Sequence, residues 1–114
     1  MTQEFNLQNT TEQQPVAQGL LMLIVPPSLE EMLVDELLQS VVSGFTSSKV
    51  NGHSTVHGDA EMDLSIVEQV TGRQQRVQFM MHASVADLKN LVLTLKARFK
   101  AKDIHYILLP ILEC

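Results

Sequence analysis

Short apolar runs and amphipathic stretches follow one another along the chain. Leu20–Val25 is an unbroken apolar run that stops at Pro26 and Pro27, and such a run bounded by prolines predicts a buried strand. Ser28 and Glu31 form a capping-box pair, so we expect a helix to begin at Ser28 and to end at Gly44. The apolar positions of this helix recur at helical spacing and predict one buried face; they are Leu29, Met32, Leu33, Leu37 and Val41.

The middle of the chain predicts a strand, a long loop and a second strand. Residues 45–51 are rich in Thr, Ser and Val and are weakly strand-like, whereas residues 52–63 are polar, contain glycine and histidine, and predict an exposed loop. Residues 65–70 favour a short helix, with a strand as the alternative. Apolar and polar residues alternate over Gln75–Met81, which is typical of a half-buried strand.

The last third predicts a helix and a final strand. Ser84 precedes a clear amphipathic pattern, Asp87 falls in its first turn, and its last turns are basic, as the helix dipole favours. His105–Leu109 predicts the last strand, which ends at Pro110.

The predicted order β-α-β-β-α-β is that of an α+β, ferredoxin-like sandwich. Right-handed crossovers place both helices on one face of a four-stranded antiparallel sheet. We expect residues 1–18, which are polar and lack an apolar period, to be a disordered or loosely attached tail, and residues 19–114 to form a single domain. The uncovered sheet face also carries apolar residues, and another copy of the chain is its expected cover.

Composition excludes some functions. The formal net charge of −5 argues against nucleic-acid binding. No basic, apolar leader and no apolar run long enough to cross a bilayer is present, so we expect a soluble protein without direct membrane insertion. The single cysteine, Cys114, cannot form an internal disulfide, which fits a reducing cytoplasm.

A family resemblance enters at residues 44–54, which read GFTSSKVNGHS. This stretch resembles the strand motif of PII signal-transduction proteins, Gly–hydrophobic–Thr–x–x–x–Val–x–Gly, which leads into their long T-loop. The stretch SIVEQVTGR before the third strand is similar to an uncharacterised bacterial PII-like subfamily. The resemblance covers residues 20–110 and implies a homotrimer with inward-facing sheets, and a regulatory, nitrogen regulatory protein-like signal-transduction role. It also implies a protein partner such as a membrane transporter or an enzyme.

The chain departs from PII proteins where they bind ATP. PII proteins hold ATP phosphates in a glycine-rich loop before the last strand, whereas this chain has only Ala101, Lys102 and Asp103 there. Glycines allow consecutive N–H groups to turn toward a phosphate, and none is present in this connection. We therefore expect no ATP binding and no bound cofactor.

Two sets of residues are candidate ligand sites. Lys49, Arg73 and Arg76 could bind a small anion in a cleft between subunits. His53 and His57 could ligate a divalent metal, because imidazole suits zinc, copper or nickel, but a loop lacks the fixed geometry of a helix, which favours a solvated polar loop over a metal site. We expect the polar loop to contact the partner through residues that include both glycines and both histidines: Gly52, His53, His57, Gly58, Asp59 and Glu61.

No catalytic motif is present in the sequence. It contains no nucleophile elbow, no phosphate-binding loop and no Cys-x-x-Cys. The expectation is a regulatory adaptor and not an enzyme. The alternative is a metal-responsive binding protein similar to the CutA type, which shares this fold and would use the histidine-rich loop. An enzyme on the same fold ranks third.

Overall fold

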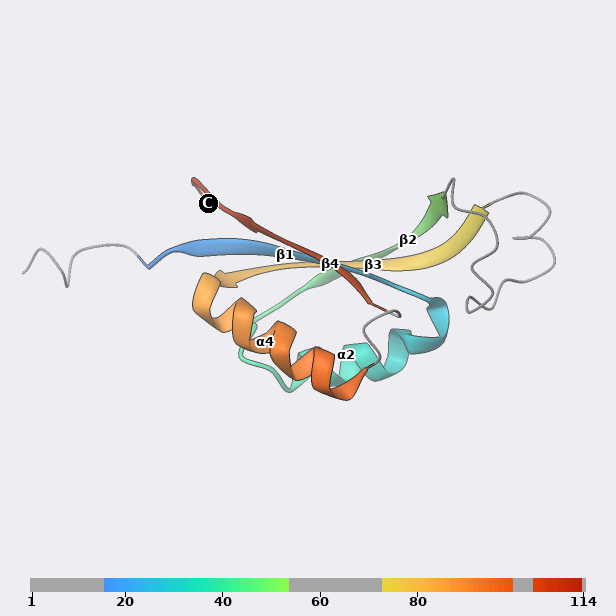
Figure 1. Cartoon of the computed structure of the whole chain (residues 1–114), viewed down its shortest axis with the longest axis horizontal. Coiled ribbons are helices and arrows are strands. Elements are labelled where there is room, and N and C mark those ends of the chain that lie inside the picture. Colours follow the sequence, from blue (N-terminus) through green and yellow to red (C-terminus); the bar gives the residue numbers. More distant parts are fainter. Residues whose placement is uncertain (1–15, 54–72, 100–103, 114) are drawn as a thin grey trace, which may run out of the picture.

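The computed structural model describes residues 16–53, 73–99 and 104–113. In these ranges four strands and two α-helices follow one another in the predicted order, with a short 3₁₀ helix before the first α-helix (Figure 1). The elements are β1 (Gln18–Val25), η1 (Pro27–Leu29), α2 (Glu30–Leu38), β2 (Thr46–His53), β3 (Arg73–Ser84), α4 (Val85–Arg98) and β4 (His105–Pro110).

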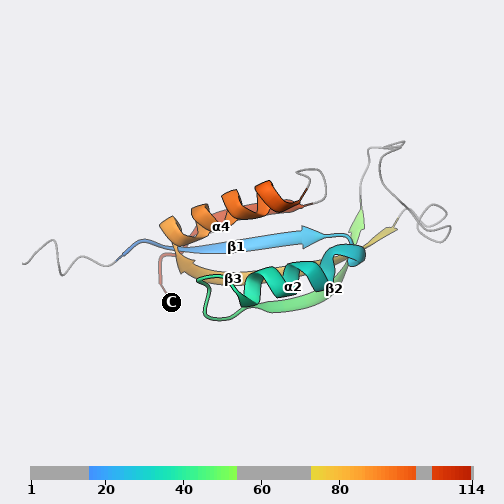
Figure 2. The ribbon, with the colours of Figure 1, turned by 90° about the horizontal axis from the view of Figure 1, so that it is seen from below.

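The strands form one antiparallel sheet in the order β2-β3-β1-β4. Both helices cover the same face of it, as Figures 1 and 2 show from two directions. The prediction of an α+β, ferredoxin-like sandwich with two helices on one face of a four-stranded sheet is confirmed. The other face, here called the open face, carries no helix of the described chain.

Strand β3 is longer than its partner β1. It pairs with β1 only from Val77 to Ser84, and with β2 from Arg73 to Met80. Its first four residues therefore extend beyond β1 with the end of β2. We call this two-stranded extension, residues 50–53 with residues 73–76, the ribbon.

The core lies between the sheet and the helices and is aliphatic apart from one ring. Phe79 in the centre of β3 is fully buried, and its ring lies 6.0 Å from that of Phe45. Alternate residues of β1 face the helices, as its strictly alternating burial shows. The buried residues of the two α-helices are Leu33, Leu37, Leu88, Leu91, Val92 and Leu95.

The prediction for α4 is confirmed in detail. The backbone N–H of Asp87 donates to Ser84 Oγ at 3.1 Å, so Ser84 caps the helix. Lys96 and Arg98 lie in the last turn, near the negative end of the helix dipole. Arg98 also forms an ion pair with Glu36 of α2, with 3.4 Å between the nitrogen and the oxygen.

Both predicted ends of the first helix are wrong. Pro27 starts a 3₁₀ turn, closed by the N–H of Leu29 donating to the Pro26 carbonyl, so Ser28 lies inside a turn and caps nothing. The helix ends at Leu38 and not at Gly44, because Ser40 Oγ donates to the Leu37 carbonyl at 2.7 Å. A side chain that binds one of the last helical carbonyls competes with continuing the helix.

The same early end changes the predicted apolar face. Leu33 and Leu37 are buried as expected, but Met32 is 53% and Val41 is 70% exposed. Val41 lies beyond the helix, so helical spacing does not apply to it.

Several strand boundaries also differ from the predictions: β1 already begins at Gln18, and β3 continues to Ser84. Gly52 and His53, which the sequence predicts to lie in an exposed loop, belong to β2 and pair with Gln74 and Arg73. Strand β3 accordingly begins at Arg73 and not at Gln75. The rest of the predicted loop, residues 54–63 with His57, Gly58, Asp59 and Glu61, lies outside the described residues. So do the helix predicted at 65–70, the connection 101–103 and Cys114.

Within the described residues, no helix combines the length and the apolar character that a membrane span needs.

Candidate functional site

The open face is apolar along its centre. Leu20, Met22 and Ile24 of β1 alternate with the buried residues of that strand and therefore point to this side. On β4, Leu109 lies opposite Leu20 and Ile107 lies opposite Met22. On β3, Met80 lies opposite Met22. Ile107 and Leu109 are 38% and 48% exposed. An apolar patch of this kind, shared by three neighbouring strands, is typical of an interface.

The charge of the open face is one-sided. The four described strands contain no aspartate or glutamate. By strand alternation the ionisable residues on the open face are Arg76, His82 and His105. The described acids lie elsewhere, mainly on α2, whose sequence EEMLVDELL contains four of them and no basic residue. The acidic helix α2 therefore lies on one side of a sheet whose four strands contain no acid.

The two open-face histidines lie far apart within one chain. His82 is opposite Leu20, and His105 is opposite Ile24 on the other side of β1. Four residues along a strand span about 13 Å. The imidazoles therefore cannot share a ligand within one subunit.

The structure does not bring the predicted anion-binding residues together. Lys49 is opposite Val77, which is buried under the helices, so Lys49 belongs to the helix-covered side. Arg76 is opposite Val50 and faces the open side. Arg73 lies on the same side of the sheet as Lys49. It pairs with His53, however, which is four residues, or about 13 Å, further along β2 than Lys49.

Arg76 is already bound by its neighbours on the ribbon. Its guanidinium donates to the Gln75 carbonyl at 2.7 Å and to Gln74 Oε1 at 2.9 Å. These bonds hold the guanidinium close to its own strand. The aliphatic part of the Arg76 side chain lies beside Gly52, since a Cβ added to Gly52 would be 3.5 Å from Arg76 Cγ. The odd spacing between residues 73 and 76 in the sequence already predicts that they lie on opposite faces of a strand.

The metal hypothesis rests on one described residue. His53 is exposed at the end of β2 and pairs with Arg73 in the ribbon. Its predicted partner His57 lies outside the described residues. Among the residues that the structure describes, no three or more His, Cys, Asp or Glu side chains form a group that could hold a metal ion.

The comparisons with known proteins agree with this architecture. The model of a family described as "Protein of unknown function (DUF3240)" matches residues 16–114. A DUF3240 family protein from Shewanella baltica has a solved structure that is 21% identical, with a TM-score of 0.65 over 85% of this chain and 92% of that one. No curated protein matches the chain.

Nitrogen regulatory PII proteins are also structurally similar. CPII, a PII-like protein from Thiomonas intermedia solved with ADP, AMP and bicarbonate, is 16% identical, with a TM-score of 0.61 over 83% of this chain and 90% of that one. The B. subtilis GlnK–ATP complex is 17% identical, with a TM-score of 0.60 over 83% of each chain. At these identities the likeness establishes the fold, and the predicted resemblance to PII-like proteins is confirmed at that level.

Proposed function

The chain belongs to the DUF3240 family of proteins of unknown function, and we propose that it is a PII-like regulatory adaptor that works as a homotrimer and not as an enzyme. The observation that carries the proposal is the open face. On a ferredoxin-like sheet with its helices on one side, the other side presents Leu20, Met22, Ile24, Ile107 and Leu109, and the four described strands contain no acid.

Assembly through the open face explains the distribution of charge. Sheets that face inward remove the apolar patch from water, which is the main favourable term in such an association. The acidic helix α2 then faces outward, where its charged residues remain hydrated. A chain of 12.7 kDa buries a modest share of its surface alone, so assembly also adds to its core.

The ribbon is the proposed partner contact. It extends past β1, where neither helix covers it, and its residues are mostly polar. The sequence places a long polar stretch directly after it. A cytoplasmic partner-binding role, with a transporter or an enzyme as the partner, follows from the resemblance to PII proteins.

A small anion is the proposed ligand, and ATP is not. CPII was solved with ADP, AMP and bicarbonate and GlnK with ATP, but this chain lacks glycine in the connection at residues 101–103. Arg76 is the candidate that faces a neighbouring copy across the open face. Lys49 and Arg73 lie on the other side of the sheet and would bind independently of assembly.

A thermal-shift panel tests the ligand part of the proposal. Bicarbonate, phosphate, ATP with magnesium, and divalent metals are added separately to the full chain. A rise in melting temperature with bicarbonate or phosphate that is lost in Arg76→Gln supports the proposal, and Lys49→Gln is the charge-matched control. A rise with metals alone would favour the CutA-like alternative, and a rise with ATP would restore nucleotide binding as in GlnK.

A further inference from the structure

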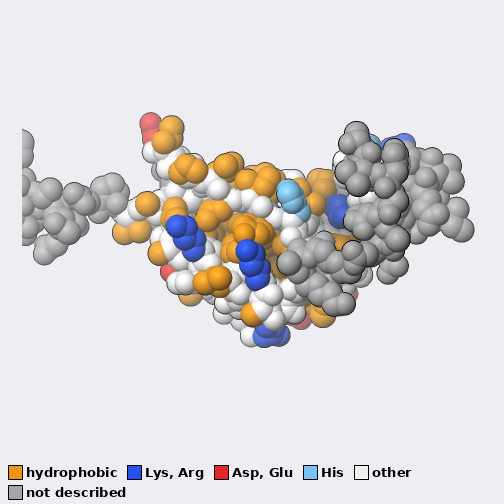
Figure 3. All heavy atoms as spheres, in the orientation of Figure 1, with side chains coloured by type: hydrophobic (Ala, Val, Ile, Leu, Met, Phe, Trp, Pro, Cys, Tyr) orange, Lys and Arg blue, Asp and Glu red, His pale blue; other side chains and the backbone are white. Residues whose placement is uncertain are grey.

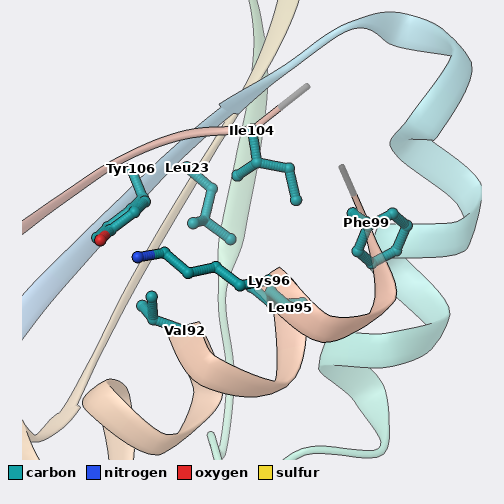
Figure 4. A pocket seen from close by; sticks show the side chains of 7 residues that line it. All are labelled: Leu23, Val92, Leu95, Lys96, Phe99, Ile104 and Tyr106. Carbon is teal, nitrogen blue, oxygen red and sulfur yellow. The ribbon is translucent and has the colours of Figure 1, made fainter. Parts of the chain in front are cut away.

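A hollow lies between α4 and the outer strand β4, on the helix-covered side of the sheet (Figure 4). Leu23, Val92 and Leu95 form its floor, and these three side chains are almost completely buried. Phe99 and Ile104 form its far wall. The hollow has a cavity volume of about 40 Å³, below the usual range for drug-sized ligands, so it has room only for part of a small molecule.

The rim of the hollow is polar and basic. The ammonium of Lys96 lies 4.8 Å from the centre of the Tyr106 ring, within the range of a cation–π contact. Figure 4 shows both side chains at the mouth, with the Tyr106 hydroxyl directed outward beside the lysine. The hollow therefore has an apolar interior, with one cation and one hydroxyl group at its mouth.

No acid neutralises this rim within the described chain. Lys96 forms no ion pair there, since the one salt bridge found in these residues joins Arg98 to Glu36. Asp87, the acid of α4, lies nine residues earlier and in the first turn, about 13 Å away along the axis. Lys89 lies two turns before Lys96 on the same side of the helix. Figure 3 shows hydrophobic side chains between lysine or arginine side chains on this surface.

We propose that this hollow binds a small amphipathic carboxylate. The apolar group of the ligand occupies the space over Leu23, Val92 and Leu95, and its carboxylate accepts hydrogen bonds from the Lys96 ammonium and the Tyr106 hydroxyl. Charge-assisted bonds of this kind are the strong ones, and the apolar contacts add affinity in proportion to the area removed from water. An alcohol of the same shape can accept these hydrogen bonds but brings no charge opposite to that of Lys96, and a cation of the same shape is repelled by Lys96.

The site is separate from the proposed assembly surface. Leu23 and Tyr106 are directly opposite each other on β1 and β4 and face the helices, whereas Met22 and Ile107 face the open side. The proposal therefore does not depend on the trimer, and the two can be tested apart.

The test is a titration of the full chain with octanoate, below its micelle-forming concentration, followed by calorimetry and methyl NMR. The expected result is saturable binding, with shifts confined to the methyl groups of Leu23, Val92 and Leu95. Lys96→Met should weaken binding by about tenfold or more, the loss expected for one charge-assisted hydrogen bond. Lys96→Arg should largely retain binding, and Lys89→Met, the matched control on the same side of α4, should leave it unchanged.

Several results would overturn the proposal. If octan-1-ol bound as tightly as octanoate, the carboxylate would not be needed for binding. Equal affinity of Lys96→Met and the wild type for octanoate would show the same. Shifts at Met22 and Ile107 instead would move binding to the open face. No saturable binding would show that the hollow is not a ligand site. The lysine variants change exposed side chains, so the test does not depend on a variant that disturbs the core.

Discussion

Among the glycines that the structure describes, Gly19 is the one where an added methyl group would meet the closest neighbours, at the point where β1, β4 and the start of α4 meet. A Cβ built on Gly19 would lie 3.2 Å from Val85 Cγ2, from Leu108 Cδ1 and from the Leu109 carbonyl oxygen. Two of these neighbours are side chains that can rotate, but the third is backbone in the β1–β4 ladder. Gly19→Ala therefore requires β4 to move away from β1, or α4 to shift.

The expected cost follows from two opposing terms. Adding a methyl group to a closely packed core costs about 1–3 kcal/mol. Replacing glycine by alanine restricts the unfolded chain and returns about 0.4–1 kcal/mol. The net loss of unfolding free energy in Gly19→Ala is thus about 1–2 kcal/mol. Gly44→Ala is the matched control, because nothing lies within 4 Å of its added Cβ and its φ is outside the left-handed range; it should stabilise by about 0.4–1 kcal/mol.

Urea unfolding followed by circular dichroism measures both changes. For a small domain the loss in Gly19→Ala lowers the midpoint by roughly 0.5–1 M, while Gly44→Ala should raise it slightly. All samples must have the same protein concentration, because assembly adds to apparent stability. A midpoint for Gly19→Ala at or above that of the wild type would show that β1 and β4 are not packed as described.

Three further predictions address the interface, a helix cap and the nucleotide. Met22→Glu should dissociate the assembly seen by light scattering without loss of helical signal, whereas Leu93→Asp, at a site 65% exposed on α4, should leave it intact; an assembled Met22→Glu variant would exclude the open face as the interface. Ser84→Ala should lower the unfolding free energy by about 1 kcal/mol through loss of the bond from the Asp87 N–H, and an unchanged urea midpoint would refute the cap. Calorimetry with ATP and magnesium should show no saturable binding, because residues 101–103 contain no glycine; micromolar binding would contradict this.

The sequence predicted the order of the elements because their periodicities are strong. Alternation over 75–81 and the stripe of α4 each depend on many residues, so one competing contact does not change them. Single-residue signals were less secure. Ser84 caps its helix as predicted, but Pro27 moved the start of the first helical turn away from Ser28, and Ser40 ended the helix before Gly44.

The candidate site depended on information that the sequence does not contain. Lys49 of β2 and Arg76 of β3 lie at neighbouring positions of two paired strands, but the register places them on opposite faces of the sheet. Register is a long-range property, set by the pairing of whole strands. The hollow under Lys96 was missed for the same reason, since Leu23, Lys96 and Tyr106 come from three elements that only the fold brings together.

Light scattering coupled to size-exclusion chromatography, on the wild-type chain at micromolar concentration, tests the central claim most directly. The proposal of a homotrimer built on the open face predicts a mass of about 38 kDa, three times the 12.7 kDa of one chain. A mass of one chain would leave Leu20, Met22, Ile24, Ile107 and Leu109 exposed to water and would contradict the proposed function. A mass of two chains would contradict the trimer.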